Sequence, residues 1–372
     1  MTLRYVRVFP SYDYVAPAVR PTGNLVVVGA GSAGAVNAPV QVSTPDEALR
    51  AFTAAGSAPS PLSASLAVAM RQNPSPTQFW GIRQDTNIAK SLEAAEALNV
   101  QFVVVANTAL TAETAKPGGA ITALRDHVVN VSDRVDGKER MGVAMLTKGI
   151  AETALVAGPL VDDRMVYVAH QSEEDAAAAV AGTIAGHPPY TSMVLKQVAI
   201  TSPPFTAAQI DALNGSEDEK NPVPPGIAGK GVVWLTSPTL IPGGGVYLGE
   251  GYTGKPNGLK FIDVQRTIDD ISFRLKARMI GAIGNLRISR SGLRALIVQM
   301  EAVLNPLLAG GVLERFEITI PVLNLLDADP DTLTPAQIQA IKDAHNGRIA
   351  QVLVSVEYAG AMHRININLK FN

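Results

Sequence analysis

The chain lacks several features that would mark a function. Its 372 residues contain no cysteine, which excludes a disulfide framework, thiolate metal ligands and a cysteine nucleophile. Charged residues make up only 17% of the chain, against a usual share of about 25%. Lys and Arg (31) nearly balance Asp and Glu (33). Proteins that track nucleic-acid phosphates normally carry a basic excess, so we expect no nucleic-acid partner.

Long apolar runs are also missing. No run reaches about 18 residues, so we expect no membrane-spanning segment and no membrane partner. The first nine residues lack the basic start and apolar stretch of a secretory signal, which predicts a protein that stays in the cytoplasm unless a larger assembly carries it out. An apolar content of 47% excludes a disordered chain. Together with the low charge, it suggests a surface largely covered by sister subunits.

What is present is an alternation of strand and helix patterns. Thr44-Pro45-Asp46-Glu47 has the form of a capping box with proline at the first helical position, and it predicts a helix that runs to Phe52 before Gly56. Strands separated by helical stretches predict βαβ units and an α/β fold. We expect strands at 25–29, 78–83, 102–106, 141–146 and 165–169, and helices at 44–52, 63–71, 88–98, 121–135 and 173–185.

The texture changes between residues 188 and 258, where prolines and glycines cluster and predict a loop-rich segment with short strands such as 231–235. Beyond it the patterns predict long helices at 262–283 and 291–308, a strand at 313–320 and a capped helix at 334–344. Residues 3–9, 348–358 and 363–371 alternate as strands. A chain that begins and ends in strands must pair their edges within itself or in a neighbour.

Two glycine-rich segments approach nucleotide-binding motifs. Gly29–Gly34 matches G-x-G-x-x-G after an apolar strand, but Pro39 stands where the following helix should continue. We interpret it as a surface loop and keep a nucleotide site as the alternative. Gly249–Pro256 approaches a P-loop, yet Pro256 replaces the hydroxyl residue that would hold magnesium. We reject a phosphate site there.

No catalytic or metal-binding constellation emerges. The paired carboxylates Asp162-Asp163 and Asp269-Asp270 are consecutive, so on a helix they point apart. Glu173-Glu174 is expected in a first helical turn, where acidic side chains complement the helix dipole. We therefore predict no enzyme, no cofactor and no metal. The histidines are scattered without ligand spacing, at His127, His170, His187, His345 and His363.

At this point the chain resembles the sheath protein of contractile tails, as found in bacteriophages, phage-tail-like bacteriocins and extracellular contractile injection systems. Each motif is short and apolar, and the resemblance rests on their order along the 372 residues. The strand–helix–strand–strand ending also fits. The segments that carry it are Arg20-Pro21-Thr22-Gly23, Leu25–Gly29, Gly34–Val42, Tyr252-Thr253-Gly254 and Phe261–Ile271.

The chain also departs from the family pattern. The usual Pro-Gly-Val-Tyr-like opening survives only as Ser11-Tyr12-Asp13-Tyr14-Val15-Ala16, and the chain is short for the family. The outer domains of large phage sheaths are therefore expected to be absent. A single chain that carries both halves favours a phage or an extracellular particle over a two-chain secretion sheath.

The resemblance implies a structural subunit that polymerises helically around a rigid inner tube in an extended, higher-energy state. On baseplate triggering the sheath contracts and drives the tube through a target cell envelope. The implied partners are other copies of this chain, the inner tail tube protein, and baseplate and tail terminator or cap proteins. The particle would be a virion tail or injection particle assembled in the bacterial host cytoplasm.

The resemblance also implies a domain plan for the α/β (α+β) fold. Residues 1–20 would form an N-terminal arm, 21–244 an outer α/β domain, and 245–372 an inner α/β domain. Terminal strands exchanged between subunits would complete the inner domain. The exchanged residues would be Leu3, Tyr5, Val6, Arg7, Val8, Ile365, Ile367, Leu369 and Phe371.

An exposed charged helix is the natural contact with the tube, because charge pairs hold register and can still break during contraction. The first candidates lie on the helix 262–283, where Asp270 and Arg274 also have the spacing of a stabilising pair. Two other classes stay open: an α/β nucleotide-binding enzyme that uses Gly29–Gly34, and another self-assembling virion structural protein. The tube-facing candidates are Asp269, Asp270, Arg274 and Arg278, with Lys342 and Asp343 second.

Overall fold

A computed structural model describes residues 23–134, 138–150, 154–214, 231–241, 243–259 and 261–363. These residues divide into two compact units. The sheet unit comprises residues 23–272, 307–316 and 356–363, and the helical unit comprises Phe273–Pro306 and Glu317–Ser355. The domain boundaries expected from the sequence, 1–20, 21–244 and 245–372, stay predictions about places in an assembly.

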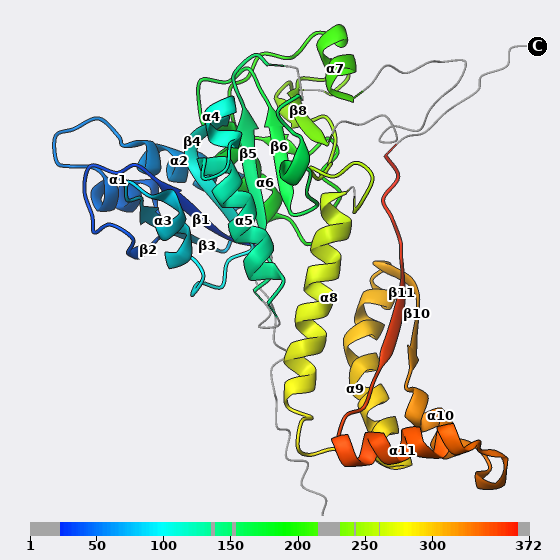
Figure 1. Ribbon diagram of the computed structural model, residues 1–372. Helices are drawn as coiled ribbons and strands as arrows, with labels where there is room; N and C mark the ends of the chain where they lie inside the picture. The colour runs from blue at the N-terminus through cyan, green and yellow to red at the C-terminus, as the bar shows by residue number, and fades with distance from the viewer. Residues whose placement is uncertain are drawn as a thin grey trace, which may run out of the picture. The chain divides into compact units, whose positions relative to one another are not determined.

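The sheet unit is built on a nine-stranded sheet with the order β2-β3-β1-β4-β5-β6-β8-β9-β7 (Figure 1). Strands β3, β1, β4, β5, β6 and β8 are parallel, whereas β2, β9 and β7 pair in antiparallel fashion at the two edges. The strands are β1 (Asn24–Gly29), β2 (Pro39–Val42), β3 (Gln78–Arg83), β4 (Phe102–Leu110), β5 (Met141–Leu146), β6 (Met165–Ala169), β7 (Gln197–Val198), β8 (Val232–Thr236) and β9 (Val246–Leu248).

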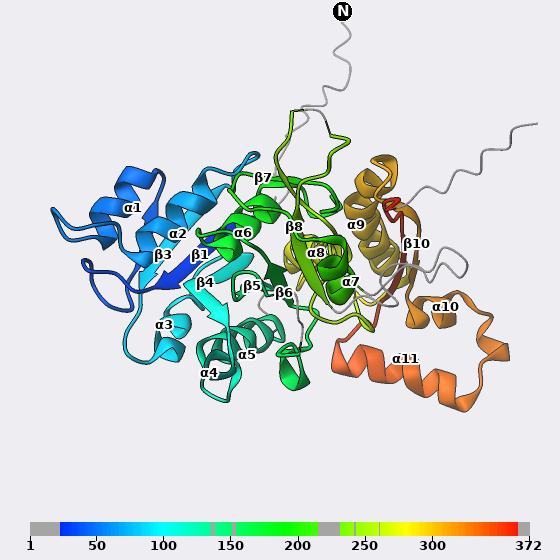
Figure 2. The same cartoon turned by 90° about the horizontal axis from the view of Figure 1, so that it is seen from above.

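Helices cover both faces of the central strands (Figure 2). One face carries α1 (Pro45–Phe52), α2 (Pro61–Met70) and α6 (Ala176–Gly186), and the other carries α3 (Ile88–Ala94), α4 (Ala112–Ala115) and α5 (Ala120–Ser132). This covering explains why β1, β5 and β6 are buried along their whole length and read as continuous apolar runs. The turn η1 (Gly158–Leu160) and α7 (Ala207–Asn214) complete the unit's elements up to β8.

The α/β prediction is confirmed, and the strands at 78–83, 141–146 and 165–169 have the predicted bounds. The helix expected at 173–185 instead begins at Ala176, because buried Asp175 caps it by accepting from the Ala178 N–H at 2.9 Å. Asp175 also accepts from Ser65 Oγ (2.5 Å) and from the Asn107 N–H (2.7 Å), so it ties α2 and β4 to α6. Glu173 and Glu174 therefore precede the helix, and their placement in its first turn was wrong.

Several short elements went unpredicted from the sequence. Strand β2 follows the glycine loop and pairs with β3, α4 is a single turn, and α7 lies inside the segment expected to be loops. In the helical unit, α10 (Pro321–Asp327) also went unpredicted. Each is eight residues or shorter, so the amphipathic period has too few turns to show.

Two helices and two strands run across the division between the units. They are α8 (Ile262–Ile280), α9 (Arg290–Ala309), β10 (Leu313–Thr319) and β11 (Leu353–Tyr358), and β10 and β11 form a separate two-stranded sheet. The helical unit further contains α10, the turn η2 (Pro330–Thr332) and α11 (Pro335–Gly347). Its small core consists of Leu293, Ile320, Val322 and Leu323.

Helix α9 is long and apolar enough to span a membrane by length and composition alone, the one such helix in the described part of the chain. Its best window has a mean hydropathy of 1.2, and 22% of that window is buried. A single such helix is weak evidence for a span, because core helices of soluble proteins meet the same criterion. Arg294 and Glu301 lie within it, and both would be costly at a bilayer centre.

A buried arginine organises the face that carries α3 and α5. Arg140 is fully buried and donates to the carbonyls of Ala95 and Leu98, both at 3.0 Å. Its guanidinium also lies 3.2 Å from His127 Nε2. Burial first, and the charge of Arg140 second, lower the pKa of His127 to about 4. The imidazole is therefore neutral in the folded protein, and Nε2 accepts from Arg140.

This arrangement predicts loss of stability in acid. The pKa of His127 is about 4 when folded and ordinarily 6.5, so the unfolded chain binds the proton more readily as the pH falls between these values. We expect the free energy of unfolding to fall by about 3 kcal/mol from this histidine between pH 7 and pH 4. Urea unfolding across that range would measure it. A His127→Gln variant should lose about 3 kcal/mol less than the wild type.

Candidate interaction surfaces

The residues expected to exchange as strands, from Leu3 to Val8 and from Ile365 to Phe371, lie outside the described residues. Their role stays a prediction. The described chain ends at His363, and the segment that leads to it can be followed from β11 onward.

The first turns of α8 are buried rather than presented to a partner. Asp269 and Asp270 are only 6% and 3% exposed. Arg164 donates to both carboxylate oxygens of Asp269, at 2.9 and 3.1 Å, and Gln265 Nε2 donates to Oδ1 at 3.1 Å. The expectation of an exposed acidic face at these two positions was therefore wrong.

The pair formed by Arg164 and Asp269 joins the start of β6 to α8. Burial alone would lower the pKa of Arg164, but the hydrogen bonds and charge of Asp269 outweigh it, and the pKa is raised. Arg266 strengthens the same region by donating to the carbonyls of His187 (2.8 Å) and Pro188 (3.2 Å), just beyond the end of α6. Cationic groups are favourable at a helix C-terminus. The charges that the sequence shows on this helix thus hold the sheet unit together.

The remaining tube-facing candidates differ in exposure. Arg274 is half-buried, and Arg278 is exposed in the last turn of α8. Lys342 and Asp343 are exposed on α11, where Gln339 Nε2 donates to Asp343 Oδ1 at 2.8 Å. The last three of these residues are therefore accessible to a partner.

The glycine loop at Gly29–Gly34 packs against the chain itself. The N–H groups of Ser32 and Ala33 donate to the Phe52 carbonyl at 3.0 and 3.3 Å, at the end of α1. A Cβ on Gly29 would stand 2.4 Å from the Ala106 Cβ, and Gly34 has a φ of +86°. The glycines therefore serve close packing and a left-handed turn. Two of the amides that a phosphate would need, those of Ser32 and Ala33, are already bound, which supports the interpretation as a loop.

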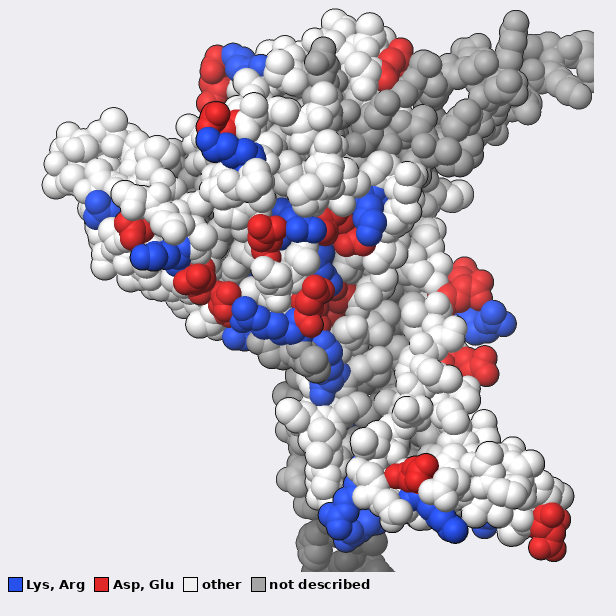
Figure 3. Space-filling model, in the orientation of Figure 1, with Lys and Arg blue, Asp and Glu red and all other residues white. Residues whose placement is uncertain are grey.

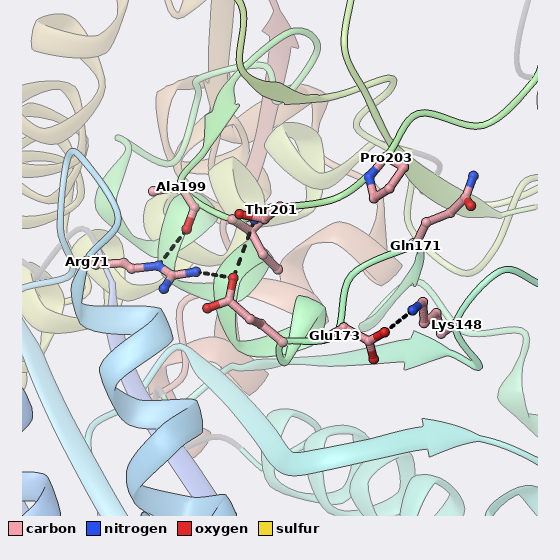
Figure 4. Close-up of a pocket in the computed structure, with 9 residues that line it drawn as sticks. Arg71, Lys148, Gln171, Glu173, Ala199, Thr201 and Pro203 are labelled. Carbon is pink, nitrogen blue, oxygen red and sulfur yellow. Dashed lines mark hydrogen bonds and ion pairs between the residues drawn. The ribbon is translucent and has the colours of Figure 1, made fainter.

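A large open cavity among the described residues lies beyond the ends of β5 and β6 and has a volume of about 710 Å³ (Figure 4). Its charged groups bind one another: Arg71 pairs with Glu174 at 2.6 Å, and Lys148 pairs with Glu173. Arg71 also donates to the Ala199 carbonyl at 2.7 Å. In these contacts the charged groups of the cavity bind one another. They also join the end of α2 to the segment between β7 and β8. The described residues contain no cluster of three metal-ligating side chains.

The end of β11 and the chain that follows it are fixed to the rest of the sheet unit at two points. Tyr358 donates its hydroxyl to Asp263 Oδ2 at 2.7 Å, and burial first and this carboxylate second raise the pKa of Tyr358. Five residues later, His363 Nδ1 lies 3.2 Å from Glu250 Oε2 and its Nε2 lies 3.0 Å from Ser192 Oγ. Phe261 packs against the His363 ring at 4.8 Å between centroids.

Serine, histidine and carboxylate in this order also occur in serine hydrolases, whose chemistry further needs donors aimed at an oxyanion. Here the N–H of Val194 points at Ser192 Oγ itself, at 3.4 Å. We therefore interpret these groups as an anchor for the C-terminal segment. The sequence could not reveal it, because 58 residues separate Ser192 from Glu250 and 113 separate Glu250 from His363.

Breaking the Arg164–Asp269 pair should be costly. An Asp269→Ala variant leaves the Arg164 guanidinium, whose side chain is only 16% exposed, without its carboxylate, and we expect a loss of about 3–5 kcal/mol in the free energy of unfolding, measured by urea denaturation. Asp343→Ala, on an exposed position, should cost under about 0.5 kcal/mol. The double variant Arg164→Met/Asp269→Leu should lose less than Asp269→Ala. Equal losses of stability in Asp269→Ala and Asp343→Ala would contradict the importance of the Arg164–Asp269 pair.

No protein-family model matches the sequence, and no curated protein matches it. Solved structures do match, along the whole chain. The contracted helical sheath of the anti-feeding prophage has a TM-score of 0.64 at 13% identity and covers 100% of this chain and 99% of that chain. The contracted PVC sheath complex, from an extracellular contractile injection system, has a TM-score of 0.62 at 12% identity, with 100% and 98% covered.

A sheath tail protein from Desulfitobacterium hafniense is similar over 84% of this chain and 93% of its own, with a TM-score of 0.57 and 12% identity. This chain has the fold of contractile tail sheath proteins.

Proposed function

We propose that this protein is the structural subunit of a contractile sheath and polymerises helically around an inner tube. The observation that carries the proposal is the end-to-end match, in which 100% of this chain aligns with 99% of a subunit of the anti-feeding prophage sheath. A shared local domain would leave part of one chain unmatched. Contraction on baseplate triggering would then drive the tube through a target envelope, without nucleotide chemistry.

The two-stranded sheet supports strand exchange. Strands β10 and β11 pair only with each other among the described residues, and most of their side chains are half-buried or exposed. An isolated two-stranded sheet is marginally stable in water, and a third or fourth strand with an apolar face stabilises it. The alternating residues around Val6 and Ile367 have the pattern of such strands. We propose that they are supplied by neighbouring subunits, so that main-chain hydrogen bonds link the polymer.

The anchor after β11 gives this exchange a defined starting point. Tyr358 and His363 hold the chain to its own subunit up to His363, two residues before Ile365, the first of the proposed exchanged residues at this end. The segment would then cross to the neighbour. A force between two linked subunits would then be carried by the contacts of Tyr358 and His363 with Asp263, Glu250 and Ser192, as well as by the exchanged strand.

The tube contact is proposed on the accessible charges. Arg278 on α8 and Lys342 and Asp343 on α11 are exposed, and half-buried Arg274 lies one turn before Arg278. Charged rims steer association and set register, which suits a contact that must release during contraction. The remaining partners would be baseplate and terminator proteins, in a virion tail or injection particle assembled in the host cytoplasm.

The proposal is tested by negative-stain electron microscopy of the purified chain at high concentration. We expect hollow cylinders with a wide lumen, because sheath subunits can polymerise without a tube. Ile367→Pro should reduce the assembled fraction at least about tenfold, since proline removes a ladder donor, and should leave the melting temperature of the monomer unchanged. Ile367→Val is the matched control and should assemble normally. Compact dimers that gain thermal stability from a nucleotide would refute the sheath function.

A further inference from the structure

The helical unit carries two opposite blocks of charge. From Ile271 to Met300 the sequence has six basic residues and no acidic one. From Phe316 to Ile341 it has four acidic residues and no basic one. The basic residues are Arg274, Lys276, Arg278, Arg287, Arg290 and Arg294, and the acidic residues are Glu317, Asp327, Asp329 and Asp331.

The basic block forms an exposed turn between α8 and α9 with an apolar centre. Ile280 and Ile283 are 72% and 77% exposed, and exposed Arg278 and Arg287 flank them in the chain. Large apolar side chains ringed by arginines are typical of protein interfaces, where an apolar centre is excluded from water and a charged rim surrounds it. We name residues 278–287 the basic turn.

The acidic block is exposed at the connection between α10 and α11. Asp329 and Asp331 flank Pro330 in η2, and both are exposed. Ile338, in the second turn of α11, is also exposed and offers an apolar surface on the same connection. We name residues 327–331 the acidic turn. Figure 3 shows red side chains at the corner beside this connection and blue ones at the opposite end of the same unit.

The two blocks already attract each other within one chain. Arg294 pairs with Asp327 at 3.1 Å, and Arg290 lies 3.4 Å from the same carboxylate. Of the two blocks, this contact uses only Arg290, Arg294 and Asp327. Within the described residues, no ion pair involves Arg278, Arg287, Asp329 or Asp331. The two arginines therefore present positive charge to solvent, and the two aspartates present negative charge.

We propose that the basic turn of one copy docks on the acidic turn of the next copy, which leaves Lys342 and Asp343, rather than Arg278, for the tube. The inference deepens the proposed function and rests on it, because a contact between two different patches of one chain is heterologous and continues as a ring or a helix. Because each chain carries both a basic turn and an acidic turn, the acidic turn of a second copy can bind the basic turn of the first. Like charges within each turn also oppose the alternative pairing of two identical turns.

The test reverses the charges and then restores them. The basic-turn variant is Arg278→Glu/Arg287→Glu, and the acidic-turn variant is Asp329→Lys/Asp331→Lys. Self-association of each purified chain is measured by sedimentation velocity at low and high salt, with negative-stain images of the products. We expect each variant to reduce the assembled fraction at least about tenfold at low salt. A 1:1 mixture of the two, and a chain with all four changes, should both recover assembly, because the charges become complementary again.

Two control variants carry the same change in net charge on exposed residues of the sheet unit. Arg50→Glu/Lys90→Glu matches the basic-turn variant, and Glu93→Lys/Asp211→Lys matches the acidic-turn variant. Both should assemble as the wild type does. Their failure would show that net charge, rather than a specific contact, controls association, and would overturn the docking proposal.

The outcomes separate this inference from the proposed function. If the wild type forms cylinders and the reversed variants do so equally well, or if the mixture fails to recover, the docking contact is overturned and the sheath function stands. If the wild type neither self-associates nor forms cylinders, the sheath function itself fails. Binding to anionic phosphatidylserine vesicles that the basic-turn variant loses, with self-association intact, would assign the basic turn to a membrane and also overturn the proposal.

Discussion

The structure depends on how α8 is held by its buried charges. Asp263, Arg266 and Asp269 all lie on its first half, and each binds a group of the sheet unit: Tyr358, the carbonyls after α6, and Arg164. A buried charge is tolerated only when it is paired and hydrogen-bonded, so these contacts leave little freedom in the placement of the helix. The same helix then continues past Ser272 into the helical unit. Its first half therefore stabilises one unit, and its second half presents Arg278 to solvent.

A subunit that moves within an assembly needs rigid bodies joined by contacts that can change. The parallel strands of the sheet unit are covered on both faces and leave no free surface in the centre of the sheet. The helical unit is different, because its core is small and its long helices expose isoleucines and charges. Exposed, complementary and salt-sensitive surfaces are suited to contacts that break and reform. This division of properties is consistent with the proposed polymer, in which subunits would keep their fold while their contacts shift.

The described glycines Gly29 and Gly182 serve close packing rather than ligand chemistry. Gly29 lies against Ala106, and Gly182 of α6 lies so close to α2 that a Cβ would stand 2.6 Å from the Ala69 carbonyl oxygen. Close approach of a helix to its neighbour requires such a residue. The charged side chains that line the cavity beside Arg71 and Lys148 likewise form ion pairs with one another. These observations explain why motifs that approach nucleotide-binding patterns occur here without the free donors that such sites require.

The sequence by itself determined the alternation of strands and helices, because the continuous apolar runs at 141–146 and 165–169 and the cap at Thr44 are local signals. It also determined the absence of thiol chemistry and the opposite charge blocks at 271–300 and 316–341. Only the tertiary structure decided which charges are surface groups. In the sequence, Asp269 and Arg278 are both charged residues of one predicted helix, with nothing to distinguish a buried position from an exposed one. In the structure, Asp269 is buried against Arg164, 105 residues away, whereas Arg278 is exposed among the described residues. Partners so distant in sequence are brought together by folding, which no local pattern records.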